Sequence, residues 1–195
     1  MLSETKIRLL VFSTLFPNNV SPHHGVFVEQ RLRHLLSSGA VSARVVAPVP
    51  WFPSRHPMFG SYATFAGVAP FERRRDIDVW HPKYAVIPKV GMQVAPWLMY
   101  RAARRPLRRL RADGFDFDLI DAHYFYPDGV AAMMIAAEFD RPFVVTARGT
   151  DINLIPDYPG PRKRILAAIR QASHLVSVSA ALQRRLCELG APQEK

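Results

Sequence analysis

The chain has 195 residues, 49% of them hydrophobic and 22% charged, a composition that excludes wholesale disorder and suffices for one domain with a sizeable core. Five of its 26 basic residues are lysines, which leaves 21 arginines, and the formal net charge is +10. Arginine binds phosphate and carboxylate through a planar fork. The charge therefore predicts an acidic partner, which is a phosphorylated substrate, an anionic membrane surface or nucleic acid.

Cysteine usage and hydropathy indicate where the protein works. The single cysteine, Cys187, excludes an internal disulfide and a cysteine-built metal site, and this fits a reducing cytoplasm. The longest apolar run, Val130–Ala137, is far shorter than the roughly 20 residues that span a bilayer. Met1–Thr5 lacks the charged and apolar parts of a signal peptide. We expect a cytoplasmic protein that lies peripherally on the inner face of the cell membrane.

The N-terminal part of the chain has the pattern of a doubly wound α/β fold. Ile7–Thr14 is apolar throughout, which is typical of a central strand. After a loop, Gly25 opens a helix that runs to Ser38, and Gly39 ends it. Arg44–Ala47 then predicts a second short strand. Strand, glycine-containing loop, helix and strand in this order open such a fold.

The next section is irregular. Pro48–Arg75 contains five prolines with aromatic residues between them. Loops of this length are usually functional or disordered, and the aromatic residues argue against disorder. Ile77–Val86 predicts a third strand, which Pro82 bends or places near a sheet edge.

Gly91–Asp113 predicts a helix with one apolar side and one arginine-rich side. The arginines that fill the side opposite Met99 and Leu107 are Arg101, Arg104, Arg105, Arg108, Arg109 and Arg111. The simplest interpretation is a solvated face. The alternatives are a platform against anionic lipid headgroups and a nucleic-acid surface. We expect no nucleic acid, because no aromatic residue is interleaved with these arginines after Tyr100.

Two short apolar runs, Leu119–Ala122 and Pro142–Ala147, flank a helical pattern and so predict a βαβ unit. Each run ends in polar residues, among them His123 after the first and Arg148 and Asp151 after the second. In open α/β sheets ligands bind beyond the carboxyl ends of the strands. The sequence therefore predicts a site at this edge of the sheet.

The rest of the chain continues the alternation. The predicted elements are a loop at Ile152–Pro161, a helix at Arg162–Ala172, a strand at His174–Ser179 and a helix at Ala180–Leu189. We expect residues 1–195 to form a single α/β domain. Its architecture is a Rossmann-like doubly wound parallel sheet of about six strands, with helices on both faces.

The chain resembles the N-terminal half of a GT-B fold glycosyltransferase of the large retaining group called family 4. Three stretches carry the resemblance: FSTLFPN…HHGVFVEQRLRHL, the pair DLIDAHYFYPDGVAA and RPFVVTARGTD, and HLVSVSAALQRRL. Their order and spacing, taken together, span nearly the whole chain.

The resemblance implies a two-domain enzyme. It would move a sugar, with retention, from a nucleoside-diphosphate sugar to a surface glycan or lipid-linked acceptor. The N-terminal domain would hold the acceptor and the C-terminal domain the nucleotide sugar. The family's pair of glutamates belongs to that second domain, so we expect this chain to be an acceptor half that is inactive by itself. The alternatives are a non-catalytic Rossmann-type module that binds an anionic partner, and a related two-domain nucleotide-sugar epimerase.

The resemblance also assigns roles to loop residues. Gly25 and Gly149 are expected to bind the donor, because glycine in such loops lets the backbone approach the diphosphate. A tight turn into a helix is the structural alternative for Gly25. The expected contacts with substrate come from Phe16, Asn18, Tyr124 and Tyr126. The two tyrosines are equally compatible with a place in the core.

His123, Arg148 and Asp151 are the candidate catalytic residues. Many relatives have histidine where this chain has Arg148, and arginine cannot act as a base. Arg148 must then hold a phosphate of donor or acceptor as a fixed charge. Asp151 either orients a hydroxyl group or pairs with Arg148. For all three we expect positioning and charge rather than covalent chemistry.

No metal site is expected, and no cofactor besides the nucleotide sugar. His23 and His24 are adjacent and point apart on an extended chain. Asp116-Phe117-Asp118 matches the Asp-x-Asp pair of metal-dependent transferases in form only, because it precedes a strand instead of following one. Asp128 is expected to cap the helix that follows it.

Overall fold

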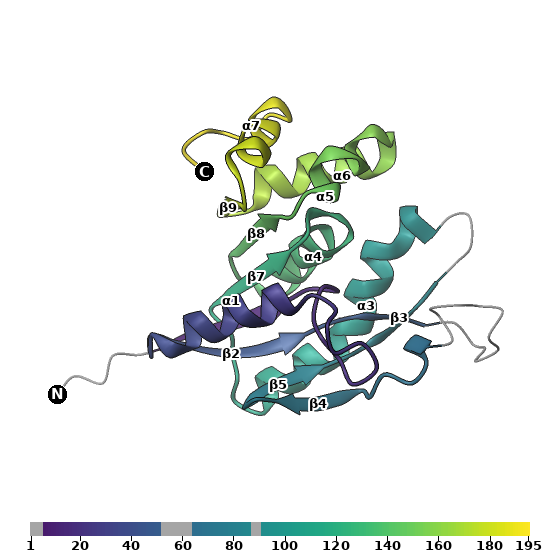
Figure 1. The fold of residues 1–195 in the computed structure, drawn as a ribbon, viewed down its shortest axis with the longest axis vertical. Coiled ribbons are helices and arrows are strands. Elements are labelled where there is room, and N and C mark those ends of the chain that lie inside the picture. The colour runs from purple at the N-terminus through teal and green to yellow at the C-terminus, as the bar shows by residue number, and fades with distance from the viewer. Residues whose placement is uncertain (1–5, 52–63, 87–90) are drawn as a thin grey trace.

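The computed structural model describes residues 6–51, 64–86 and 91–195. A seven-stranded sheet forms its centre (Figure 1). From one edge to the other the strands are β4 (Phe71–Arg74), β5 (Ile77–Trp80), β2 (Val41–Val46), β1 (Ile7–Phe12), β7 (Leu119–His123), β8 (Phe143–Ala147) and β9 (His174–Ser177). All of these strands are parallel except β4, which pairs antiparallel with β5 at the edge.

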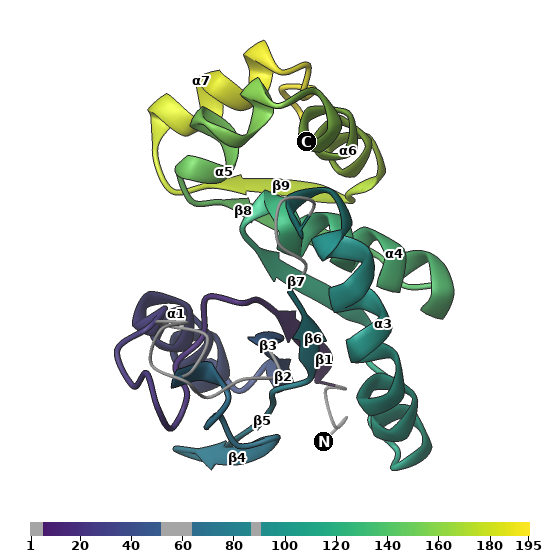
Figure 2. The same cartoon turned by 90° about the vertical axis from the view of Figure 1, so that its right-hand side faces the viewer.

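Helices cover both faces of the sheet (Figure 2). One side carries α1 (Val26–Ser37), α5 (Thr150–Asn153) and α7 (Ala180–Glu188). The other side carries α3 (Gly91–Ala112), α4 (Val130–Phe139) and α6 (Pro159–Gln171). The predicted doubly wound sheet of about six parallel strands with helices on both faces is therefore confirmed.

The central strand β1 shows why the sheet is buried on both faces. Leu10 and Phe12 pack into the core under α3 and α4, while Leu9 and Val11 pack into the core under α1. Successive strand residues point to opposite faces, so an apolar strand feeds both layers at once. Each fully buried side chain of this size contributes roughly 1.5–3 kcal/mol.

Pro82 divides the predicted third strand in two. β5 stays in the main sheet, whereas β6 (Lys83–Ala85) pairs in parallel with β3 (Val49–Trp51) in a separate two-stranded sheet. Proline has no N–H for a sheet ladder. Its carbonyl instead accepts a hydrogen bond from Val49 N at 3.0 Å, which turns the chain into the second sheet. The prediction of one continuous strand over Ile77–Val86 is wrong.

Two further regions differ from the prediction. The irregular Pro48–Arg75 section contains β3 and β4, and Arg75 and Asp76, both with positive φ, make the tight hairpin from β4 to β5. Residues 52–63 of that section lie outside the described part of the chain. The predicted loop Ile152–Pro161 instead holds the second half of α5, the short helix η3 (Ile155–Asp157) and the start of α6, which proline at the first helical position favours.

The predicted helix at Gly91–Asp113 is confirmed as α3, and four of its six arginines are in ion pairs. Arg104 and Arg108 both contact Glu138 of α4, at 2.8 and 2.6 Å. Arg111 contacts Asp116 at 2.8 Å. These pairs fasten α3 to the domain. Burial acts to raise the pKa of Glu138, but hydrogen bonds from Arg104, Tyr100 and Arg108 outweigh it and hold that pKa at about 2. Among the described helices none is long and apolar enough to cross a membrane.

Gly25 allows α1 to start close to the end of β1. It has a φ of +66°, and a Cβ atom placed on it would lie 2.2 Å from the carbonyl carbon of Leu15. Both the left-handed backbone and this close approach require glycine. Gly39, which follows α1 as predicted, shares the left-handed backbone with a φ of +75°, but a Cβ there would meet nothing within 4 Å.

Replacing Gly25 with alanine should therefore cost more stability than the same change at Gly39. Gly39→Ala introduces backbone strain of about 1–2 kcal/mol, and Gly25→Ala adds a backbone clash that forces the loop away from α1. We expect Gly25→Ala to lower the free energy of unfolding by roughly 3 kcal/mol or more in urea titrations. Equal losses for the two variants would contradict the close approach described here.

Candidate functional site

Polar side chains meet at the carboxyl ends of β1, β7 and β8. His123 is the last residue of β7, and Arg148 and Asp151 follow β8. The parallel register pairs His123 with Thr146, so both strands end at the same edge. The three predicted catalytic residues are brought together there. The turn after β7 is η2 (Phe125–Gly129), and Ser13 after β1 donates to the backbone oxygen of His123 at 3.2 Å.

The ring of His123 is buried and both of its nitrogen atoms face charged groups. Nη2 of Arg148 lies 2.8 Å from Nδ1. Arginine can only donate, so Nδ1 must accept and the proton resides on Nε2. Nε2 faces Oδ2 of Asp121 at 3.5 Å. His123 is thus a neutral imidazole whose orientation is fixed from both sides.

Arg31 and Asp121 belong to this site but were not among the predicted site residues. Arg31, from α1, forms a short ion pair with Oδ2 of Asp121. The Arg31 guanidinium is also 3.4 Å from Nε2 of His123, which in this tautomer is a contact between two donors. Asp121 is buried, whereas the side chain of Arg31 keeps 36% of its surface exposed. Arg31 therefore places a positive charge at the open side of the site.

Burial and neighbouring charges set the protonation states. Burial lowers the pKa of His123, and the positive charges of Arg148 and Arg31 lower it further, against the opposing effect of Asp121. Burial acts to raise the pKa of Asp121, but hydrogen bonds and charges from His123 and Arg31 outweigh it, so the pKa lies below the ordinary value. Burial also lowers the pKa of Arg148, which remains charged at neutral pH.

Arg148 is held over an aromatic ring. Its guanidinium lies 4.8 Å from the ring centre of Phe27, in the first turn of α1, and Phe27 is 46% exposed. Stacking of this kind holds the planar group while leaving N–H donors available. Nε of Arg148 is buried and has no hydrogen-bond partner among the described residues. Arg148 therefore retains donor capacity for an anion.

Asp151 supports the backbone around the site. Its carboxylate accepts hydrogen bonds from the backbone nitrogens of Phe125 at 2.7 Å, Gly149 at 2.8 Å and Arg148 at 3.0 Å. Burial raises its pKa, and these hydrogen bonds oppose the rise. Asp151 thus contacts the backbone of Arg148 and ties the turn after β7 to the loop after β8. The carboxylate is fully buried, so in this arrangement its contacts are structural.

Asp128 is bound to the first loop instead of capping a helix, so the predicted cap is wrong. Its carboxylate accepts a short hydrogen bond from Thr14 N and one from Thr14 Oγ1 at 3.1 Å. The N-cap of α4 is Gly129, which provides no side-chain bond. The turn conformation of η2 directs Asp128 toward β1. Burial raises the pKa of Asp128 to about 7.

The two predicted donor-binding glycines have different surroundings. Gly149 has a φ of +140°, and a Cβ there would meet nothing within 4 Å, so the backbone beside it is open to a ligand. Gly25 lies against the backbone of Leu15 and Phe16. The close approach that requires glycine at position 25 is thus between two parts of this chain. Donor binding at Gly25 and at Gly149 stays a prediction.

The predicted substrate contacts are distributed between core and surface. Phe16 is buried in the core under α1, and Asn18 accepts hydrogen bonds from Val20 N and Ser21 N, which shapes the loop. Tyr126 is buried and donates to the backbone oxygen of Met92 in α3. Tyr124 is half-buried beside the site; burial raises its pKa, and a hydrogen bond with Thr150 opposes the rise. Of these four residues, Tyr124 is the one beside the candidate site, where it could contact a ligand.

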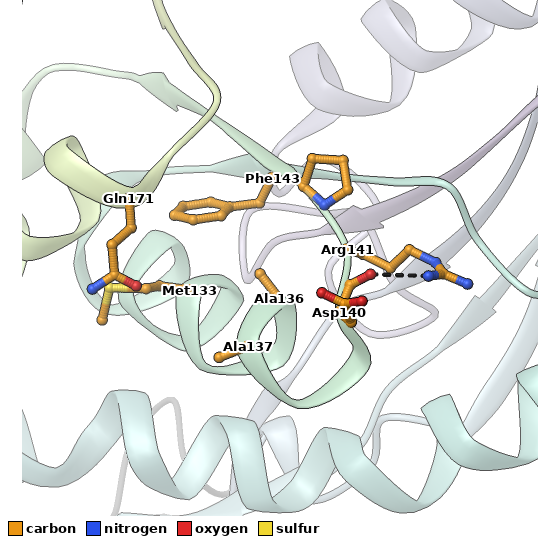
Figure 3. Close-up of a pocket in the computed structure, with 8 residues that line it drawn as sticks. Met133, Ala136, Ala137, Asp140, Arg141, Phe143 and Gln171 are labelled. Carbon is orange, nitrogen blue, oxygen red and sulfur yellow. Dashed lines mark hydrogen bonds between the residues drawn. The ribbon is translucent and has the colours of Figure 1, made fainter.

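One hollow lies away from this edge. This hollow (Figure 3), with a volume of about 330 Å³, is at the start of β8, opposite the candidate site, and lies between α4 and α6. Its Arg141 donates to Asp140 O at 2.9 Å, as Figure 3 shows, and to Asp116 at 2.8 Å. The Asp-x-Asp match is at the same opposite edge, where Asp118 pairs with Arg8 at 2.7 Å. No metal-binding group of side chains is found among the described residues.

Removing the Asp151 carboxylate should destabilise the protein. Asp151→Ala leaves three backbone N–H groups, one buried and two partly buried, without this acceptor, at roughly 1 kcal/mol for each. We expect the free energy of unfolding to fall by about 3 kcal/mol in urea titrations, whereas Asp157→Ala, an exposed control, changes it by less than about 0.5 kcal/mol. If Asp151→Ala unfolds like the unmodified chain, the carboxylate is not structural.

The raised pKa of Asp128 predicts a pH-dependent stability. The folded-state pKa of about 7 lies above the ordinary aspartate value of about 3.9, so the folded protein holds this proton more tightly than the unfolded chain. The stabilisation is complete below pH ~4 and is lost as pH rises through ~7, by about 4 kcal/mol. Asp128→Asn should remove this component from denaturation curves measured across that range. Parallel pH profiles for the two proteins would contradict the assignment.

Comparison with known proteins identifies the family. The family model described as Glycosyltransferase Family 4 matches residues 63–195. TuaC of Bacillus subtilis (strain 168), a proposed glycosyltransferase of teichuronic acid biosynthesis, is 29% identical over 185 residues, which cover 94% of this chain and 47% of TuaC. The chain thus spans about half the length of this relative.

A solved structure shares the fold. A proposed UDP-N-acetylglucosamine 2-epimerase from Listeria monocytogenes has a TM-score of 0.53 at 12% identity. The matched region covers 97% of this chain and 44% of the epimerase chain. Arabidopsis thaliana UGT89C1, in complex with UDP, has a TM-score of 0.47 at 18% identity. The matched region covers 90% of this chain and 43% of the UGT89C1 chain. The family model matches well over half of the sequence, and the chain belongs to Glycosyltransferase Family 4.

Proposed function

We propose that this chain is the acceptor-binding half of a retaining glycosyltransferase. The complete enzyme would transfer a sugar from a nucleoside-diphosphate sugar to a surface glycan or lipid-linked acceptor. Membership of Glycosyltransferase Family 4 supports the reaction class. The observation that carries the proposal for the site is the pair of guanidinium groups, Arg31 and Arg148, beside a buried neutral His123 at the carboxyl edge of the sheet.

The two arginines form a site for an anionic group of a substrate. Like charges placed close together repel, and the charge of Arg31 lowers the pKa of Arg148. Asp121 neutralises part of this charge through Arg31, but the site keeps an excess of donors on its open side. A phosphate or carboxylate would satisfy them through charge-assisted hydrogen bonds. In this way the arginines supply the positive charge that a divalent cation supplies in metal-dependent transferases, so no metal is proposed.

His123 acts as a positioning residue in this proposal. Its Nδ1 accepts from Arg148 and its Nε2 faces Asp121, so both nitrogens are already engaged. The imidazole is therefore not a free base in this arrangement. It fixes the direction of the Arg148 guanidinium, and fixed charge near a reacting phosphate lowers the barrier without a reorganisation cost.

The donor would be bound by a second, C-terminal domain of the same protein facing this edge. The open backbone at Gly149 and the start of α1 at Gly25 would then border the diphosphate. A single domain with half of the site would have no complete activity, so the fragment is proposed to be inactive. The reaction would take place at the cytoplasmic face of the membrane, with α3 as the element that lies on the lipid.

Epimerisation of a nucleotide sugar is the alternative that shares this architecture. The fold likeness to a proposed epimerase bears on the fold only, since the identity is 12%. The two activities differ in their need for an acceptor. Transfer consumes the donor and releases the nucleoside diphosphate as the acceptor is glycosylated, whereas epimerisation leaves the sugar on the nucleotide.

Substitution of the arginines in the full-length enzyme tests the proposal. With a panel of nucleoside-diphosphate sugars and a candidate acceptor, Arg148→Gln and Arg31→Gln should each lower acceptor-dependent nucleotide release by about tenfold or more. Arg33→Gln removes the same charge from an exposed position on the same helix and should leave the rate unchanged. Nucleotide-sugar isomers without nucleotide release would identify an epimerase. Full activity of both arginine variants would overturn the assignment of the site.

A further inference from the structure

A second basic pocket lies on the α3 side of the sheet, away from the candidate site. Its volume is about 500 Å³, and it is an open hollow between α3 and the segment that links β5 to β6. The residues that line it are Pro70, Trp80, His81, Pro82, Lys83, Ala102, Arg105, Pro106 and Arg109. The N-terminal end of α3 is bonded to the turn after β7 through Tyr126 and Met92. At about 1.5 Å per residue, Arg105 lies roughly 20 Å further along the helix.

The walls of this pocket are apolar. Trp80 packs against Phe71 with ring centres 5.1 Å apart, and three prolines complete the lining. His81 is buried and already bonded to Ala47 O at 3.1 Å and to Glu72 at 3.0 Å, and Lys83 donates to Ala66 O at 2.9 Å. These groups form the frame of the pocket and leave its interior to an apolar group.

Its rim is basic and has little opposite charge. Arg105 has no ion pair or hydrogen bond within the part of the chain that the structure describes. Arg109 has a single contact, 3.7 Å from Asp113 in the same helix, with 83% of its side chain exposed. Such an exposed pair contributes little. By contrast Arg104 and Arg108 are tied to Glu138, so the structure separates the arginines that hold the helix from those that face solvent.

The exposed face of α3 continues toward its start with an aromatic residue. Trp97 is 47% exposed, and the guanidinium of Arg101 lies 4.8 Å from its ring centre. Tryptophan beside arginine is the composition of a surface at the boundary between lipid headgroups and acyl chains. The exposed face of α3 therefore has the composition of a membrane-binding surface and lies next to an open hollow of about 500 Å³.

We propose that this pocket binds the phosphate-bearing end of one anionic membrane lipid, with the phosphate at Arg105 and Arg109 and the adjoining apolar chain against Trp80. The inference rests on the membrane contact proposed for α3 and goes beyond it. Membrane binding by a diffusely basic face of α3 would depend on charge alone. A lipid seated in the pocket depends on charge and on open space, and these can be removed separately.

Vesicle flotation with the full chain tests this. Binding to vesicles of phosphatidylcholine with phosphatidylglycerol is expected, and binding to phosphatidylcholine alone is not. Arg105→Gln/Arg109→Gln should weaken binding by about tenfold or more, whereas Arg33→Gln/Arg184→Gln, a double loss of exposed charge elsewhere, should weaken it less. Ala102→Phe fills the pocket without changing charge and should weaken binding as well.

Each outcome separates the possibilities. If Ala102→Phe binds like the unmodified chain while the Arg105/Arg109 pair is weakened, the contact is diffuse electrostatics and the pocket proposal fails. No binding to anionic vesicles overturns both the pocket and the membrane contact. Because Ala102→Phe can also destabilise the fold, its melting temperature is first compared with that of the unmodified chain. Ala102→Leu serves as a variant that fills the pocket with a smaller side chain. Displacement by excess glycerol phosphate would show that the site takes free phosphate without the lipid chain.

Discussion

The candidate site depends on the hydrogen bond from the Arg148 guanidinium to Nδ1 of His123, at 2.8 Å. A charged donor on Nδ1 excludes a proton there, so it fixes the tautomer and keeps the buried imidazole neutral. The neutral ring in turn holds Arg148 in one direction, over the ring of Phe27. The Arg31–Asp121 ion pair closes the other side of the ring. Without these contacts the guanidinium groups of Arg31 and Arg148 would not each be held in one orientation.

The backbone around this bond is held in place by buried carboxylates. Asp151 gathers three backbone N–H groups from the ends of β7 and β8, and Asp128 binds Thr14 after β1. Buried polar groups are costly unless satisfied, so these carboxylates contribute rigidity where the strands end and loops begin. The result is a rim in which acidic residues face inward to the backbone and basic residues face outward. This division explains how a strongly basic protein can carry aspartates at its candidate site and still attract anions.

The fold and the site were predictable from the sequence to different degrees. The convergence of His123, Arg148 and Asp151 was predictable because each lies just after an apolar run, and parallel strands end at one edge whatever their packing. Arg31 was missed because its place depends on the rotation of α1 over β7, which periodicity defines only approximately. Asp121 lies within a strand and alternates onto the face of α1, so its partner could be known only from the packing. The β4–β5 hairpin was missed because Arg75 and Asp76 lack the glycine that marks such turns. Asp128 and Phe16 took structural roles because loop conformation, and not strand order, decides which way they point.

The central claim is that His123 is neutral, with its proton on Nε2, because Arg148 donates to Nδ1. Nitrogen-15 NMR of the imidazole in the labelled chain measures the tautomer and its titration directly. We expect an unprotonated Nδ1 and a protonated Nε2 that persist below pH ~6.5, the ordinary pKa of histidine, and a titration that moves back toward that value in Arg148→Gln. A ring with its proton on Nδ1, or one that titrates like an exposed histidine in the unmodified chain, would contradict the account.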